Sequence, residues 1–140
     1  MTNDELNGLG YTLTVDDLLD MAMEMMGEDQ KSRRGYAPYA AAITNFLLAD
    51  CFHANNAVRT QAQKQALTEL PSVSVGTDVL PYEYETVINL LMPGMAFYLL
   101  VQDDENDKAN IFNAVYEANK AKYPKTLPAE YEKTENNYRW

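Results

Sequence analysis

Residues 79–107 read VLPYEYETVINLLMPGMAFYLLVQDDEND and hold the most regular apolar pattern of the chain. Apolar side chains recur there at the spacing of one helix face, at Tyr84, Val87, Ile88, Leu91, Met92, Met95, Ala96 and Leu99. Pro93 and Gly94 interrupt this run, although a proline inside a regular helix costs about 3 kcal/mol. Because the pattern stays in phase across Pro93, it predicts one helix that begins at Pro81 and bends at Pro93.

The bend at Pro93 is predicted to be buried. Each flanking Leu, Met or Phe side chain that leaves water contributes about 1.5–3 kcal/mol, so a few of them outweigh the defect. Gly94 has no side chain, and we expect it to let a neighbouring backbone approach the bend closely. The bend would then fit this helix against its neighbours.

A first helix is predicted to begin after Thr14. The Thr14 hydroxyl is a typical N-cap, Asp16 and Asp17 suit the positive end of the helix dipole, and Gly27 is a typical end. The residues between them form one apolar stripe, made of Val15, Leu18, Leu19, Ala22, Met25 and Met26. We interpret its methionines as core residues.

A second helix is predicted from Pro38, because a proline is tolerated in the first helical turn. Residues 28–35 before it are expected to form a charged loop. The helix is expected to run through Cys51 as far as Val58, and its apolar side chains occupy so many directions that its first half is predicted to be buried on most sides. These are Tyr39, Ile43, Phe46, Leu47, Leu48, Cys51, Phe52, Ala54 and Val58.

The last predicted helix covers about Asp107–Tyr123 and ends before Pro124. Its inner side is expected to carry Ala109, Phe112, Val115 and Tyr116. The chain is therefore expected to be all-α, a compact bundle of about four helices with a long loop and an extended C-terminal tail. We divide it into an N-terminal arm (1–13), a helical domain (14–123) and a C-terminal tail (124–140).

Two segments outside the helices are predicted to contact a partner. Residues 67–80, LTELPSVSVGTDVL, form a long loop in which Val73 and Val75 alternate as in a short strand or an extended edge. Residues 124–140, PKTLPAEYEKTENNYRW, have almost no aliphatic side chains but contain Tyr131, Tyr138 and Trp140. Such aromatics either anchor the tail on another chain or cover part of their own domain. The predicted partner-binding residues are Val73, Val75, Tyr131, Tyr138 and Trp140.

Composition limits the class of function. The chain has 140 residues and a formal net charge of −10, which disfavours specific nucleic-acid binding and anionic membrane surfaces. The longest apolar stretch, Leu90 to Val101, is shorter than a membrane span, and no signal peptide is predicted. His53 and Cys51 point to different sides of a helix, so we expect neither a metal site nor a catalytic pair. No catalytic motif is present, and we predict a protein that is not an enzyme and uses no cofactor.

The order of these elements resembles the small helical head–tail connector proteins, also called adaptor or neck proteins, of tailed bacteriophages and prophages. The resemblance lies in TVDDLLDMAMEMMGE, in YAPYAAAITNFLLADCF and in the loop and helix that follow them. Its most specific residues are Asp78, Leu80-Pro81-Tyr82, Leu91-Met92-Pro93-Gly94 and Ala96 through Leu100, before an acidic turn and a helix with VYEA. The Met-rich first helix and the aromatic tail depart from the pattern.

The resemblance implies a structural subunit that docks as a ring beneath the portal in the virion. It also implies synthesis in the bacterial host cytoplasm, a monomer before assembly, and contacts with the portal protein and a tail-side neck protein. Negative charge would suit a channel through which DNA slides. Two alternatives remain open at this point: an acidic DNA-mimic inhibitor, whose carboxylates would follow phosphate-like spacing, and a small helical regulatory subunit.

Overall fold

The computed structural model describes residues 12–123, and this range is helical, which confirms the predicted all-α class. The elements are α2 (Val15–Met26), α3 (Arg33–Asp50), α4 (Phe52–Gln61), α5 (Tyr84–Thr86), η1 (Val87–Leu91), α6 (Met92–Gln102) and α7 (Asn106–Ala121). Since α5, η1 and α6 run on as a single helix from Tyr84 to Gln102, the described chain has five helices.

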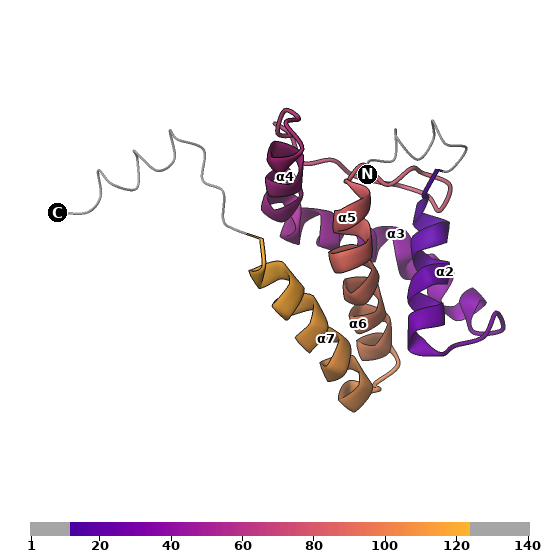
Figure 1. The fold of residues 1–140 in the computed structure, drawn as a ribbon. Helices are drawn as coiled ribbons and strands as arrows, with labels where there is room; N and C mark the ends of the chain where they lie inside the picture. The colour runs from indigo at the N-terminus through magenta and orange to yellow at the C-terminus, as the bar shows by residue number, and fades with distance from the viewer. Residues whose placement is uncertain (1–11, 124–140) are drawn as a thin grey trace.

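The long helix that ends in α6 lies at the centre of the molecule. Helix α2 packs on one side of it and α7 on the other, while α3 crosses behind (Figure 1). Helix α7 runs antiparallel to it, because Asn119 of α7 donates a hydrogen bond to the carbonyl of Asn89 in η1 (2.8 Å). The opening stretch of the sequence thus supplies the helix against which the other helices pack.

Helix α2 begins and ends where the sequence predicts. The Thr14 hydroxyl accepts a hydrogen bond from the backbone N–H of Asp17 (3.2 Å), and the Asp17 carboxylate accepts one from the N–H of Thr14 (2.9 Å), which is a capping box. Gly27 closes the helix in the left-handed conformation (φ 77°). The predicted inner face needs one correction, because Met23 is buried and Met25 is 38% exposed.

Helix α3 begins earlier and ends sooner than the sequence predicts. Helix α3 already includes Arg33, so Pro38 lies inside it rather than in its first turn, and the loop before it is shorter than 28–35. Cys51 separates α3 from α4, whereas the sequence pattern predicted one continuous helix. Proline removes one helical hydrogen bond, but the packed residues that follow Pro38 outweigh that loss.

Residues 62–83 connect α4 to α5 without forming a strand. Within residues 12–123 the structure has a single isolated bridge, between Thr14 and Val79, so of the two forms expected for Val73 and Val75 the short strand is absent. The loop instead pairs with the start of α2, where the N–H of Asp16 donates to the carbonyl of Gly76 (2.8 Å). The loop is ordered because it satisfies N–H groups that a helix N-terminus leaves free.

A π-helical turn accommodates the proline in the long helix. In η1 the N–H of Met92 donates to the carbonyl of Val87, five residues earlier, directly before Pro93. The predicted bend therefore takes the form of a wide turn, and the helix begins at Tyr84 instead of Pro81. The buried face also differs from the predicted stripe, because Leu90 and Leu100 are buried while Tyr84 is 37% exposed.

Gly94 marks the place where three helices meet. A Cβ atom at this position would lie 2.5 Å from Leu47 Cδ2 of α3 and 3.0 Å from the Tyr116 ring of α7. The close approach therefore involves side chains, and the predicted approach of another backbone is wrong.

The helix of residues 84–102 is also long and apolar enough to cross a membrane by length and composition, with 56% of that window buried in the protein.

Candidate interaction surface

The outer side of α3 presents a row of uncharged residues. The inner side is buried and consists of Tyr36, Ala40, Ile43, Thr44, Leu47 and Leu48. The outer side is exposed. Between the exposed charged residues Arg34 and Asp50 at its two ends it consists of Gly35, Pro38, Tyr39, Ala42, Phe46 and Ala49, which we call the α3 stripe. Phe46 is 67% exposed and Tyr39 is 44% exposed. This corrects the prediction that the first half of this helix is buried on most sides.

Aromatic residues of α6 extend the α3 stripe sideways. The rings of Phe46 and Tyr98 are stacked, with centroids 6.3 Å apart and planes 23° apart. The ring of Phe97 lies 4.9 Å from that of Tyr98, and Val101 is 42% exposed. Aromatic pairs of this kind contribute beyond the area that they bury. The stack therefore holds Phe46 in one place even though most of its side chain faces water.

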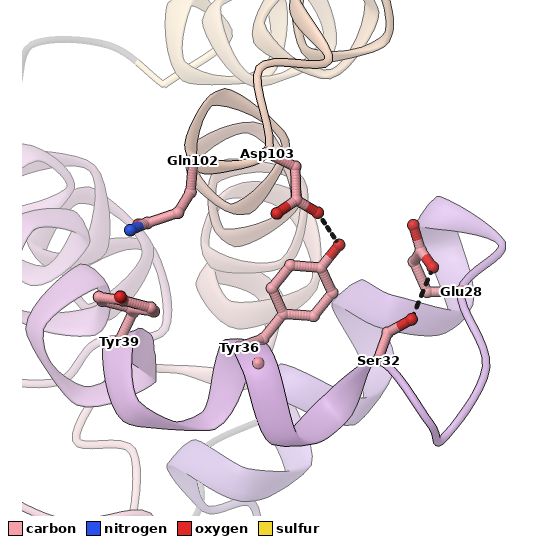
Figure 2. Close-up of a pocket in the computed structure, with 7 residues that line it drawn as sticks. Glu28, Ser32, Tyr36, Tyr39, Gln102 and Asp103 are labelled. Carbon is pink, nitrogen blue, oxygen red and sulfur yellow. Dashed lines mark hydrogen bonds between the residues drawn. The ribbon is translucent and has the colours of Figure 1, made fainter.

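A polar pocket opens at the N-terminal end of the α3 stripe (Figure 2). It has a volume of about 490 Å³ and is lined by Glu28, Ser32, Gly35, Tyr36, Tyr39, Gln102 and Asp103. Gly35 and Tyr39 belong to both the pocket and the α3 stripe. The two features therefore form one continuous surface over α3 and the end of α6.

Acidic groups dominate the chemistry of this pocket. The Tyr36 hydroxyl donates a hydrogen bond to the Asp103 carboxylate, and the Ser32 hydroxyl donates one to Glu28 (3.0 Å) (Figure 2). Burial, together with the hydrogen bond to Asp103, raises the pKa of Tyr36, so its hydroxyl stays protonated at neutral pH. None of the residues that line this pocket is basic. A cationic group suits the pocket, and an anion is repelled.

A second polar cluster joins α3 to α7 on the inner side. The Tyr116 hydroxyl donates to the Asp50 carboxylate and lies 3.2 Å from Cys51 Sγ, while Lys120 Nζ lies 2.8 Å from Asp50. Burial raises the pKa of Cys51 to about 11, so the thiol is protonated and a poor nucleophile at neutral pH. For Asp50, burial raises the pKa, but the hydrogen bonds from Lys120 and Tyr116 outweigh it and lower the pKa overall. This cluster fixes α7 on α3.

A third cluster fixes α4 to the start of α5. Glu83 is 2% exposed, and its carboxylate pairs with Arg59 Nη1 (3.0 Å) and Lys64 Nζ (3.3 Å). Asn55 Oδ1 accepts hydrogen bonds from the N–H of Glu83 and the hydroxyl of Thr86, both at 2.9 Å. The side-chain nitrogen of Asn55 is buried without a protein partner. These contacts account for a buried carboxylate that the sequence pattern did not reveal.

The structure separates the predicted partner-binding residues. Val73 is 6% exposed, and both its N–H and its carbonyl bond to the Asn45 side chain (2.8 and 2.9 Å), so it lies in the core. Val75 is 54% exposed and is accessible to a partner. Tyr131, Tyr138 and Trp140 lie outside the described residues. Binding by these residues stays a prediction.

Sequence reasoning missed the α3 stripe because Tyr39 and Phe46 look like core residues. The available signal was the lack of charged residues on any side of residues 35–49, which is unusual in a chain with net charge −10.

No protein-family model, curated protein or solved structure matches the chain. Within residues 12–123 no group of three or more His, Cys, Asp or Glu side chains could hold a metal ion. The α3 stripe with its pocket is the candidate site.

Proposed function

We propose that the chain is a structural head–tail connector subunit of a tailed bacteriophage or prophage, and that it docks as a ring beneath the portal. The observation that carries this proposal is the α3 stripe, in which Phe46 exposes 67% of its surface and Tyr39 44%. Rows of exposed apolar side chains with a polar surround are typical of protein–protein contact sites. The chain acts by contact and not by catalysis.

The packing around the α3 stripe supports a preformed contact surface. Phe46 rests on Tyr98, and the inner side of the same helix packs on Gly94 through Leu47. A rigid aromatic side chain loses little conformational freedom when a partner covers it, which is why aromatics often dominate binding energies. Neighbouring copies in a ring would cover this surface.

The charge of the chain also supports the proposal. A formal net charge of −10 would keep the inner wall of the ring from binding the phosphates of DNA that passes through its channel. The proposed partners are the portal protein and a tail-side neck protein, and the place of action is the virion. The resemblance of residues 14–123 to connector proteins is a further support.

The test uses the full chain and purified portal rings of the same phage. Size-exclusion chromatography of a dilute sample with light scattering should give a free monomer of 15.9 kDa. Mass photometry should show that portal rings gain several such masses when the chain is added. Ile111→Ser serves as a control for surface change, because Ile111 is 63% exposed on α7, and it should bind like the wild type. Portal rings that gain no mass from the wild-type chain would contradict the proposal.

A further inference from the structure

We infer that the α3 stripe and its pocket bind the C-terminal residues Tyr138, Arg139 and Trp140 of a second copy of the chain. The inference deepens the proposed function and rests on it in one respect, namely that copies of the chain meet in a ring. It names the occupant of the surface and the contact that joins one copy to the next.

The end of the chain has the chemistry that this surface accepts. Tyr138 and Trp140 flank Arg139, so the last three residues offer two aromatic rings and one guanidinium group. The α3 stripe offers the exposed rings of Tyr39 and Phe46 and no charged side chain. Stacked aromatic rings and an arginine placed over a ring are both favourable contacts.

Charge favours the pocket as the place where Arg139 binds. Glu28 and Asp103 line the pocket, and the Tyr39 ring belongs to its wall. A guanidinium group pairs with carboxylates through several N–H donors at once. Glu28 and Asp103 accept one hydrogen bond each from Ser32 and Tyr36, which leaves each carboxylate with further acceptor sites.

Charge also favours a tail over the body of another copy as the occupant. Residues 124–140 contain three basic and three acidic side chains, whereas the whole chain has a net charge of −10. Two acidic bodies repel each other, but a segment whose side-chain charges balance approaches an acidic surface with much less repulsion. The tail is therefore the part of a second copy that best covers the α3 stripe.

The tail is long enough to reach a neighbouring copy. It follows Tyr123, whose hydroxyl accepts a hydrogen bond from Asn89 Nδ2 (3.0 Å). Seventeen residues follow Tyr123, and at about 3.3 Å each they reach at most about 56 Å. The donor and acceptor surfaces differ, so each copy gives one tail and receives one, and such a head-to-tail contact forms a ring when the rotation from copy to copy closes.

A labelled peptide of residues 124–140 tests the inference. Fluorescence anisotropy of this peptide should rise and saturate as the unlabelled full chain is added. Phe46→Ser in the full chain should weaken binding at least tenfold, whereas Ile111→Ser should change it less than twofold. A peptide that does not bind, or that binds Phe46→Ser as well as it binds the wild type, would overturn the inference.

Changes in the peptide separate the aromatic contacts from the charged one. Replacing both Tyr138 and Trp140 with alanine should abolish the anisotropy change. Arg139→Glu should weaken binding about tenfold, and the matched change Lys125→Glu should have less than a twofold effect. Equal losses from Arg139→Glu and Lys125→Glu would show that only overall charge matters and would remove the pocket from the account.

The emission of Trp140, the single tryptophan of the chain, distinguishes a second copy from the same copy. The emission maximum should shift to the blue as the full chain is concentrated, and Phe46→Ser should remove the shift. A blue-shifted maximum that does not depend on concentration would mean that the tail covers its own body, which overturns the inference. If portal rings gain mass but the peptide does not bind, the proposed function stands and this inference fails. If the peptide binds but portal rings gain no mass, copies of the chain meet through their tails and the proposed function fails.

Discussion

Phe46 and Leu47 are neighbours in α3, and both are large apolar residues, yet Phe46 is 67% exposed and Leu47 is 0% exposed. Leu47 points to Gly94 of α6, where a Cβ would already meet it at 2.5 Å. Phe46 touches one ring, that of Tyr98, and otherwise faces water. The comparison shows that hydrophobicity makes a residue suitable for contact, while the fold decides whether the contact is internal or with another molecule.

The two sides of α3 therefore have different tasks. The inner side holds the domain together through the helices that meet at Gly94 and Tyr116. The outer side adds little to the stability of a single copy and is proposed to join copies together. Substitutions on the two sides should therefore separate stability from association.

The largest effect is expected at Leu47. Leu47→Ala should lower the free energy of unfolding by about 2–5 kcal/mol, because it leaves a cavity among α3, α6 and α7. Urea unfolding followed by circular dichroism measures this directly. A loss under about 1 kcal/mol would mean that the inner side of α3 is less closely packed than described.

A pair of glycines sharpens the comparison. Gly94→Val should lower the free energy of unfolding by about 1–3 kcal/mol, because the new side chain would collide with Leu47 and the Tyr116 ring. Gly35→Ala on the α3 stripe is the matched control, since a Cβ there meets nothing within 4 Å. It should raise stability by up to about 1 kcal/mol, because alanine favours the helix. Destabilisation by Gly35→Ala would contradict an open outer side.

The buried thiol predicts a loss of stability at alkaline pH. Cys51 has a pKa raised to about 11 by burial, compared with 9.0 for the exposed thiol, so the unfolded chain releases its proton first as pH rises. Stability should be intact below pH 9 and should decline between pH 9 and 11, by about 1 kcal/mol at pH 10 from this group alone.

The contribution of Cys51 can be separated from that of the tyrosines. Tyr36, Tyr82 and Tyr116 also have raised pKa values because of burial, and they add to the alkaline loss in any variant. Cys51→Ser should therefore lose less stability than the wild type between pH 8 and pH 10 in parallel urea titrations. Identical slopes for the two proteins would show that the thiol is not buried.

The smallest effect on stability is expected at Phe46. Phe46→Ser should change the free energy of unfolding by no more than about 0.5 kcal/mol, because most of the ring is already in water. Thermal and urea unfolding beside Ile111→Ser would check this. A loss as large as that of Leu47→Ala would place Phe46 in the core and remove the contrast between the two sides.

The sequence predicts the helices better than it predicts their surroundings. Thr14 and Gly27 mark the ends of α2 correctly because capping depends on residues close in the chain. The π turn before Pro93 depends on how the long helix packs against its neighbours, and no residue type in the sequence predicts it. The fold class therefore follows from local patterns, whereas the shape of the central helix does not.

The candidate surface was the least predictable part. An apolar residue such as Phe46 fits a helix stripe on either side of α3, and only the positions of α6 and α7 decide which side is covered. Val73 illustrates the opposite case, since it appears available in a loop but is held in the core by Asn45. Burial depends on contacts between distant residues, which one sequence does not record.

The most direct test of the central claim is the number of chains held by each portal ring for the wild type and for Phe46→Ser, measured side by side by mass photometry. If the outer side of α3 joins copies, Phe46→Ser lowers this number by at least half while its free energy of unfolding stays within about 0.5 kcal/mol of the wild-type value. Equal numbers for the two proteins, with equal stability, would show that the outer side of α3 does not join copies and would contradict the account.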